Sequence, residues 1–237
     1  MFHDRVEAGR RLGRALADRR GTGVVVLGLS PGGIMVAREV SRALDAVLDV
    51  IVVRTVGAPQ EAELAMGAVG ENSAAVVDPH VAGRHRLGPR ALAVGRTHLW
   101  TELERAVHSL RGDLPPVVLC GRRVVLVDDG AATGTTARAA CEVARALGAG
   151  EVILASPVAA PAVVEDLAEV ADEVVFLHSL PAGEETADHY DDFRPPGDHE
   201  VTGTLRSAAA ERAGHPEPAW ARERDAPGVA RRAVVPL

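Results

Sequence analysis

The sequence predicts an α/β protein with a doubly wound parallel sheet and a small additional region. Three observations support this prediction. Short all-apolar runs, each the length of a buried strand, alternate with longer segments of helical periodicity. Most of these runs end in glycines or other small residues. Apolar residues make up 47% of the chain but aromatic residues only 3%, so the core must consist of small aliphatic side chains, as is usual between helices and a parallel sheet.

The first half of the chain begins with a predicted helix in residues 1–20, where Val6, Leu12 and Leu16 share one face. Gly21 and Gly23 end it. Residues 24–27 are all apolar and predict a buried strand, followed by a glycine-containing turn and a helix at 34–44. Residues 49–54 predict the next strand. Residues 57–78 are rich in Gly and Ala and fit either an extended hairpin or a loop.

The second half continues the alternation. Helices are predicted at 89–110, at 134–147 and from Pro161, a residue favoured at the first helical position. Strands are predicted at 122–127, 152–158 and 173–178. A last helix is expected at 201–213. We therefore expect one domain over residues 1–213 and a Pro- and Arg-rich tail over 214–237, which has no periodicity.

Composition excludes several classes of function. The net charge of −7 argues against a nucleic-acid-binding protein, which would show a basic stripe. No apolar run is long enough to span a membrane, and residues 1–20 lack the apolar region of a signal peptide, so we expect a cytoplasmic protein. Cys120 and Cys141 are too few for a disulfide framework. All 26 basic residues are arginines, so no lysine is available for catalysis.

The most informative segment is 124–136, VVLVDDGAATGTT, which predicts a strand, two carboxylates, a loop of small residues and a helix. Small residues let backbone amides approach a phosphate at the positive end of a helix. Asp128 and Asp129 stand at the carboxyl end of the strand, where their oxygens would accept hydrogen bonds from ribose hydroxyls. The spacing and the lack of lysine exclude a Walker A loop, and the glycines are misplaced for a dinucleotide fingerprint. A turn that binds no ligand remains the alternative.

This segment resembles the signature of type I phosphoribosyltransferases, which bind phosphoribosyl pyrophosphate (PRPP). Further segments extend the resemblance over about residues 1–210: 25–33 (VVLGLSPGG), 57–59, 63–68 and 190–193 (YDDF). The resemblance implies a parallel core sheet with a small hood over the site of the acceptor base. The ribose 5-phosphate would be bound by Gly130, Ala131, Ala132, Thr133, Gly134, Thr135 and Thr136. Pyrophosphate would be bound by Leu29, Ser30, Pro31, Gly32, Gly33 and Arg54.

The implied reaction moves 5-phosphoribose from PRPP to a nitrogenous base or related acceptor and releases pyrophosphate. Asp128 and Asp129 are the candidate catalytic residues, Asp129 to stabilise a cationic ribose and either residue as a general base. Tyr190 and Phe193 are the candidate base-contacting residues of the hood. Mg²⁺ would be carried on PRPP, with no direct protein ligand expected, and a homodimer is possible. Two alternatives stay open: a non-catalytic protein that senses PRPP or a nucleotide, and transfer from a different phosphorylated ribose.

The sequence departs from the family pattern at the pyrophosphate turn. Related proteins usually place Arg or Lys just before the paired glycines, where this chain has Pro31, and usually end the next strand in Arg-Lys, where it has Arg54-Thr55. Two cations that would meet pyrophosphate are thus missing. Because proline lowers the cost of a cis peptide bond, Pro31 suggests that the Ser30–Pro31 bond is cis, with an ordinary tight turn as the alternative.

Overall fold

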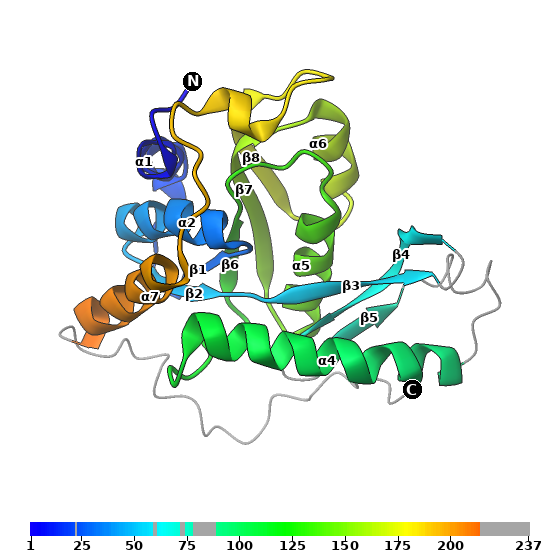
Figure 1. The fold of residues 1–237 in the computed structure, drawn as a ribbon. Helices are drawn as coiled ribbons and strands as arrows, with labels where there is room; N and C mark the ends of the chain where they lie inside the picture. The colour runs from blue at the N-terminus through cyan, green and yellow to red at the C-terminus, as the bar shows by residue number, and fades with distance from the viewer. Residues whose placement is uncertain (22, 59–60, 72–73, 78–88, 214–237) are drawn as a thin grey trace.

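A computed structural model describes residues 1–21, 23–58, 61–71, 74–77 and 89–213 (Figure 1). The helices are α1 (Arg5–Ala15), α2 (Pro31–Leu44), α4 (Pro89–Arg111), α5 (Thr135–Ala146), α6 (Pro161–Leu167) and α7 (Asp198–Ala213), with short 3₁₀ helices η1 (Ala17–Arg19) and η2 (Thr186–His189). The strands are β1 (Val25–Gly28), β2 (Val47–Val50), β3 (Val53–Ala58), β4 (Glu61–Gly70), β5 (Ala75–Val77), β6 (Arg123–Val127), β7 (Glu151–Ala159) and β8 (Glu173–Ser179).

The core is a five-stranded sheet in the order β2-β1-β6-β7-β8, and every neighbouring pair is parallel. The predicted fold class is therefore confirmed. Strands β1 and β6 are adjacent in the sheet but far apart in the sequence, with Gly28 paired to Val127 at their carboxyl ends. From this edge the chain leaves β1 for α2 and leaves β6 for α5.

Helices cover both faces of the sheet. Figure 1 shows α1, α2 and α7 on one side and α5 and α6 on the other. Alternate residues of the central strands divide accordingly: Val125 and Val127 of β6 pack with the side of α2, whereas Val124 and Leu126 pack with the side of α5. Because α2 and α5 lie on opposite faces, the carboxyl ends of β1 and β6 form the switch point of the sheet, the place where ligands bind in open α/β folds.

A second, antiparallel sheet of β3, β4 and β5 projects from the core and corrects one prediction. The sequence indicated a single strand at 49–54, but β2 ends at Val50 and β3 starts at Val53, in the other sheet. The chain crosses between the sheets here because β3 pairs with β4, from Val53 opposite Gly70 onward. Of the two alternatives for 57–78, the described residues show the extended one.

A buried charged cluster joins this second sheet to the core. The Arg111 side chain at the end of α4 is 5% exposed and donates Nε to Asp49 of β2 at 2.8 Å and Nη2 to the Val50 carbonyl at 2.7 Å. Its guanidinium also pairs with Glu71, which follows β4 and accepts the Val52 amide at 3.2 Å. These contacts fix where β3 and β4 leave the core sheet.

The last predicted helix is present and begins three residues earlier than expected, at Asp198. The expected tail, 214–237, lies outside the described residues. None of the described helices combines the length and the apolar character that crossing a membrane requires.

Candidate functional site

The two sequence-predicted turns lie side by side at the carboxyl ends of β1 and β6. The Leu29 amide donates to the Val127 carbonyl at 3.0 Å, which ties the start of the β1–α2 turn to the last residue of β6. Ser30 Oγ donates to Asp128 Oδ1 at 2.7 Å and so joins the two turns through their side chains. Residues 98 positions apart in the sequence thus form one site.

Asp128 is held by neutral hydrogen-bond donors. Its Oδ1 accepts the Ser30 hydroxyl and, at 3.1 Å, the Asp129 amide. Burial, together with the neighbouring Asp129 carboxylate, raises the pKa of Asp128 to about 7, although the Ser30 hydrogen bond acts in the opposite direction. A carboxyl group with this pKa can both accept and release a proton near neutral pH, as a general acid or base must.

Asp129 is held by a cation that the sequence did not indicate. Arg5, in the first turn of α1, donates Nε to Asp129 Oδ2 at 2.7 Å, and both side chains are largely buried, at 11% and 16% exposed. The Tyr190 hydroxyl donates to the Asp129 backbone carbonyl at 2.7 Å. The Asp129 side chain and backbone are therefore fixed by two segments from opposite ends of the chain.

The phosphate loop leaves the amino end of α5 open to an anion. The Ala131 amide donates to Val158 at 2.9 Å and the Ala131 carbonyl accepts the Ala160 amide at 3.1 Å, which attaches the loop to the end of β7. Gly134 precedes α5 at φ 72°, a left-handed conformation that glycine adopts without strain, and no side chain caps the helix there. The exposed predicted residues of the loop are Ala132, Thr133, Thr135 and Thr136. Uncapped amides and hydroxyls here can bind phosphate oxygens.

The pyrophosphate turn offers fewer donors than expected. Ser30 is the N-cap of α2, and its Oγ accepts the Gly33 amide at 2.9 Å. Ile34 donates to the Ser30 carbonyl, Leu29 is bonded to Val127, and Pro31 has no N–H. Two amides of the turn, those of Leu29 and Gly33, are thus already committed within the protein, as is the Ile34 amide that follows it.

The prediction of a cis Ser30–Pro31 bond is wrong. The described part of the chain contains no cis peptide bond. Pro31 instead occupies the first position of α2, where the fixed φ of proline suits the helix and its missing N–H leaves no hydrogen bond unmade. The helix accordingly starts three residues before the predicted Ile34.

Gly32 and Gly33 are required by the close approach of the two turns. A Cβ on Gly32 would lie 2.7 Å from Arg5 Nε and would overlap the Asp129 carboxylate. A Cβ on Gly33 would lie 2.7 Å from the Val127 carbonyl oxygen and 3.0 Å from the Asp128 Cα, both backbone atoms that cannot easily move. Only glycine at these positions lets α2 begin directly against the acid pair.

The candidate hood residues, Tyr190 and Phe193, belong to an aromatic group at this end of the sheet. Phe2 and Tyr190 form an isolated parallel bridge, and the Tyr190 side chain is buried with its ring 5.4 Å from Phe2 and 4.9 Å from Phe193. Phe193 in turn has the Arg5 guanidinium 3.9 Å above its ring. In this arrangement the Tyr190 and Phe193 rings pack against each other and Phe193 also packs against Arg5, and the contact with a base that the sequence suggested for them stays a prediction.

Two arginines, Arg54 and Arg5, differ in position or role from what the sequence indicated. Arg54 is exposed at the start of β3, where its recorded hydrogen bond is to the Val53 carbonyl at 3.0 Å, and it makes no contact with the turn in the described structure. Arg5 was missed because α1 carries several arginines with no local feature to single one out, and its partner Asp129 is 124 positions away.

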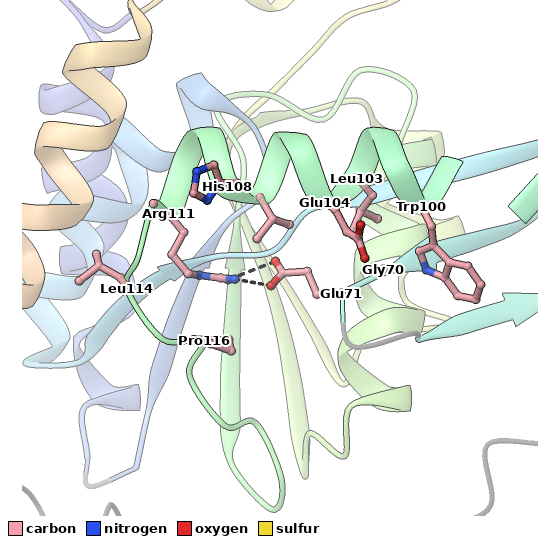
Figure 2. A pocket seen from close by; sticks show the side chains of 11 residues that line it. Gly70, Glu71, Trp100, Leu103, Glu104, His108, Arg111, Leu114 and Pro116 are labelled. Atoms are coloured by element: carbon pink, nitrogen blue, oxygen red, sulfur yellow. Dashed lines mark hydrogen bonds and ion pairs between the residues drawn. The ribbon is translucent and has the colours of Figure 1, made fainter. Parts of the chain in front are cut away.

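A cavity beneath α4 is separate from this site. It has a volume of about 490 Å³ and lies beneath α4, lined by residues such as Trp100, His108, Arg111 and Glu71 (Figure 2). Neither turn contributes a residue to its lining. The close-up shows Arg111 directed at Glu71, so the most strongly charged part of this cavity belongs to the buried cluster that joins the sheets.

Comparison with known proteins identifies the family of the chain. Residues 3–178 match the family model of the phosphoribosyl transferase domain. Two Mycobacterium tuberculosis proteins, from strains H37Rv and CDC 1551, are 44% identical over 209 residues; the first is named "Putative phosphoribosyl transferase Rv0571c". That alignment covers 88% of this chain and 47% of each relative, so the chain spans about half the length of the curated relatives it matches.

A solved structure agrees over nearly its whole length. The crystal structure of TT1426 from Thermus thermophilus is 38% identical, with a TM-score of 0.79, and the match covers 87% of this chain and 98% of that one. The chain therefore belongs to the phosphoribosyl transferase domain family and has the type I phosphoribosyltransferase fold.

Proposed function

We propose that the protein transfers 5-phosphoribose from PRPP to a nitrogenous base or related acceptor and releases pyrophosphate. The observation that carries this proposal is the hydrogen bond from Ser30 to Asp128, because it joins the candidate phosphate loop and the candidate pyrophosphate turn at one edge of the sheet. Their separation along the chain and their closeness in space suit a ligand with an anionic group at each end and a ribose between them.

The roles follow from where each group lies. The ribose 5-phosphate would be bound by the loop 130–136 and the amino end of α5. The ribose hydroxyls would meet the acid pair, since the hydrogen bonds from Arg5, Ser30 and the Asp129 amide use only Asp129 Oδ2 and Asp128 Oδ1. Asp129 would stabilise positive charge that develops on the ribose as the bond to pyrophosphate breaks. Asp128 is suited to accept the proton that the acceptor nitrogen loses.

The acid pair also fits Mg²⁺ carried on PRPP. Mg²⁺ prefers oxygen ligands and usually keeps several water molecules, and the two uncommitted carboxylate oxygens could bind those waters. The described residues contain no group of three or more His, Cys, Asp or Glu side chains that could hold a metal by themselves. When bound, the ion would neutralise charge on the pyrophosphate leaving group.

One observation favours the second candidate, a non-catalytic sensor of PRPP or a nucleotide. The pyrophosphate turn has Pro31 where related proteins have a cation, and its Leu29 and Gly33 amides are committed to the protein. A site of this kind would bind the ribose phosphate end of a ligand while holding its pyrophosphate end weakly.

Pyrophosphate release distinguishes the two candidates. Purified protein would be incubated with PRPP, Mg²⁺ and a panel of purine, pyrimidine and pyridine bases, and pyrophosphate would be measured by a coupled assay. Transfer predicts release that depends on one class of acceptor and is lost in Asp129→Asn. PRPP binding without release for any acceptor would support the sensor.

A further inference from the structure

Arg5 makes three independent contacts next to the acid pair, where PRPP is proposed to bind. Nε donates to Asp129 at 2.7 Å, Nη1 donates to the Arg194 carbonyl at 2.8 Å, and the guanidinium lies 3.9 Å above the Phe193 ring. The hydrogen bonds and the ring both favour a cation, and an arginine side chain stays charged at any pH at which the protein is folded. A permanent positive charge therefore lies against one member of the acid pair.

The other member has no such partner. The groups facing Asp128 are the Ser30 hydroxyl, the Asp129 amide and the Asp129 carboxylate, while Tyr190, whose pKa is raised by burial, reaches only the Asp129 carbonyl. Two adjacent carboxyl groups resist being ionised together, and the proton goes to the one with less compensation. The contacts identify that one as Asp128.

We propose that Arg5 is a positioning residue of the proposed PRPP site, which fixes the Asp129 side chain against Gly32 and thereby leaves Asp128 as the member of the acid pair that exchanges a proton. The inference deepens the proposed function by dividing the roles of the two acids. Asp129 would be the constant negative charge facing the ribose, and Asp128 the group that takes up and releases a proton. The raised pKa of Asp128 agrees with this division.

The test is a titration of the protein without ligand, so its result does not depend on PRPP binding. Aspartate labelled with ¹³C at the side-chain carboxyl would be followed by NMR from pH 5 to 9. We expect one carboxyl to titrate in the neutral range, and this signal to be lost in Asp128→Asn and kept, with a lower midpoint, in Asp129→Asn. A neutral-range titration that survives Asp128→Asn would overturn the proposal, because the proton would then reside on Asp129.

The role of Arg5 is tested by Arg5→Gln and Arg5→Lys. Removing the cation should raise the neutral-range midpoint by about one pH unit, and lysine should partly restore it. The matched control is Arg10→Gln, on the same helix, where an exposed arginine pairs with Glu39 at 3.0 Å. If Arg5 only attaches α1 to residues 190–194, Arg5→Gln would lower the stability and leave the midpoint unchanged, and the proposal would be refuted. If Arg5→Gln does not fold, the titration midpoints of Arg5→Lys and of the two aspartate variants still decide whether the proposal holds.

Discussion

Asp128 is expected to lower the free energy of unfolding near neutral pH, where it would act as a general acid or base. Its pKa rises on folding from 3.8 to about 7, mainly because burial penalises the charged form. The folded state therefore binds this proton more tightly than the unfolded state does. The resulting stability is present at low pH and is lost as the pH rises through the interval between the two pKa values.

Replacing Asp128 with asparagine removes this penalty while keeping the shape of the side chain. A shift of about three pH units at 1.36 kcal/mol per unit amounts to about 4 kcal/mol. We expect Asp128→Asn to raise the free energy of unfolding by up to about 4 kcal/mol at pH 8.5 and by less than about 2 kcal/mol at pH 5, where much of the proton-linked stability remains. The variant should at the same time lose phosphoribosyl transfer.

Urea unfolding followed by circular dichroism at the two pH values measures this difference. The matched control is Asp113→Asn, an exposed carboxylate that follows α4 and should change the stability little at either pH. An Asp128→Asn gain that is the same at pH 5 and pH 8.5, or a loss at pH 8.5, would refute the reasoning that Asp128 is a buried, proton-binding carboxyl group.

Three further changes test other contacts of the structure. Arg111→Met leaves Asp49 and Glu71 buried without their cation and should lower the free energy of unfolding by about 3–5 kcal/mol in urea; a loss under about 1 kcal/mol would contradict the buried cluster. Tyr190→Phe keeps the ring packing but removes the hydrogen bond to Asp129, so it should cost about 1 kcal/mol in the same assay, and unchanged stability would count against that bond. Gly32→Ala should weaken PRPP binding in calorimetry at least tenfold by displacing Asp129 and Arg5, whereas Gly203→Ala on the open face of α7 should leave it unchanged; equal affinities would show that the two turns are not in contact.

The sequence was sufficient for the parts of the fold that depend on local pattern. Continuous apolar runs such as 124–127 are buried on both faces of a parallel sheet, and each therefore identified a strand directly. The strand–loop–helix unit around residues 124–136 could also be predicted, because a strand, two acids, small residues and a helix are consecutive in the chain. The boundary between β2 and β3 could not, since residues 50–53 are all apolar and only the distant pairing of Val53 with Gly70 separates the two strands.

The site likewise contains features that could not be predicted from the sequence, because they depend on contacts between distant residues. Pro31 was interpreted from the energetics of its own peptide bond, although the capping of α2 by Ser30 decides its conformation. The aromatic residues 190 and 193 were expected to contact a base, and their packing depends on Phe2 and Arg5 at the other end of the chain. Contacts between side chains so far apart in sequence depend on the assembled sheet.

Isothermal titration with PRPP tests the central claim most directly. Purified protein would be titrated with PRPP and with ribose 5-phosphate, each with and without Mg²⁺, and the titrations repeated on the variant carrying both Asp128→Asn and Asp129→Asn. A PRPP-dependent transferase predicts micromolar, Mg²⁺-dependent binding of PRPP that is tighter than the binding of ribose 5-phosphate and is lost in the double variant. Binding of ribose 5-phosphate or a nucleotide with no binding of PRPP would contradict the claim, because the phosphate loop would then be functional and the pyrophosphate turn would not.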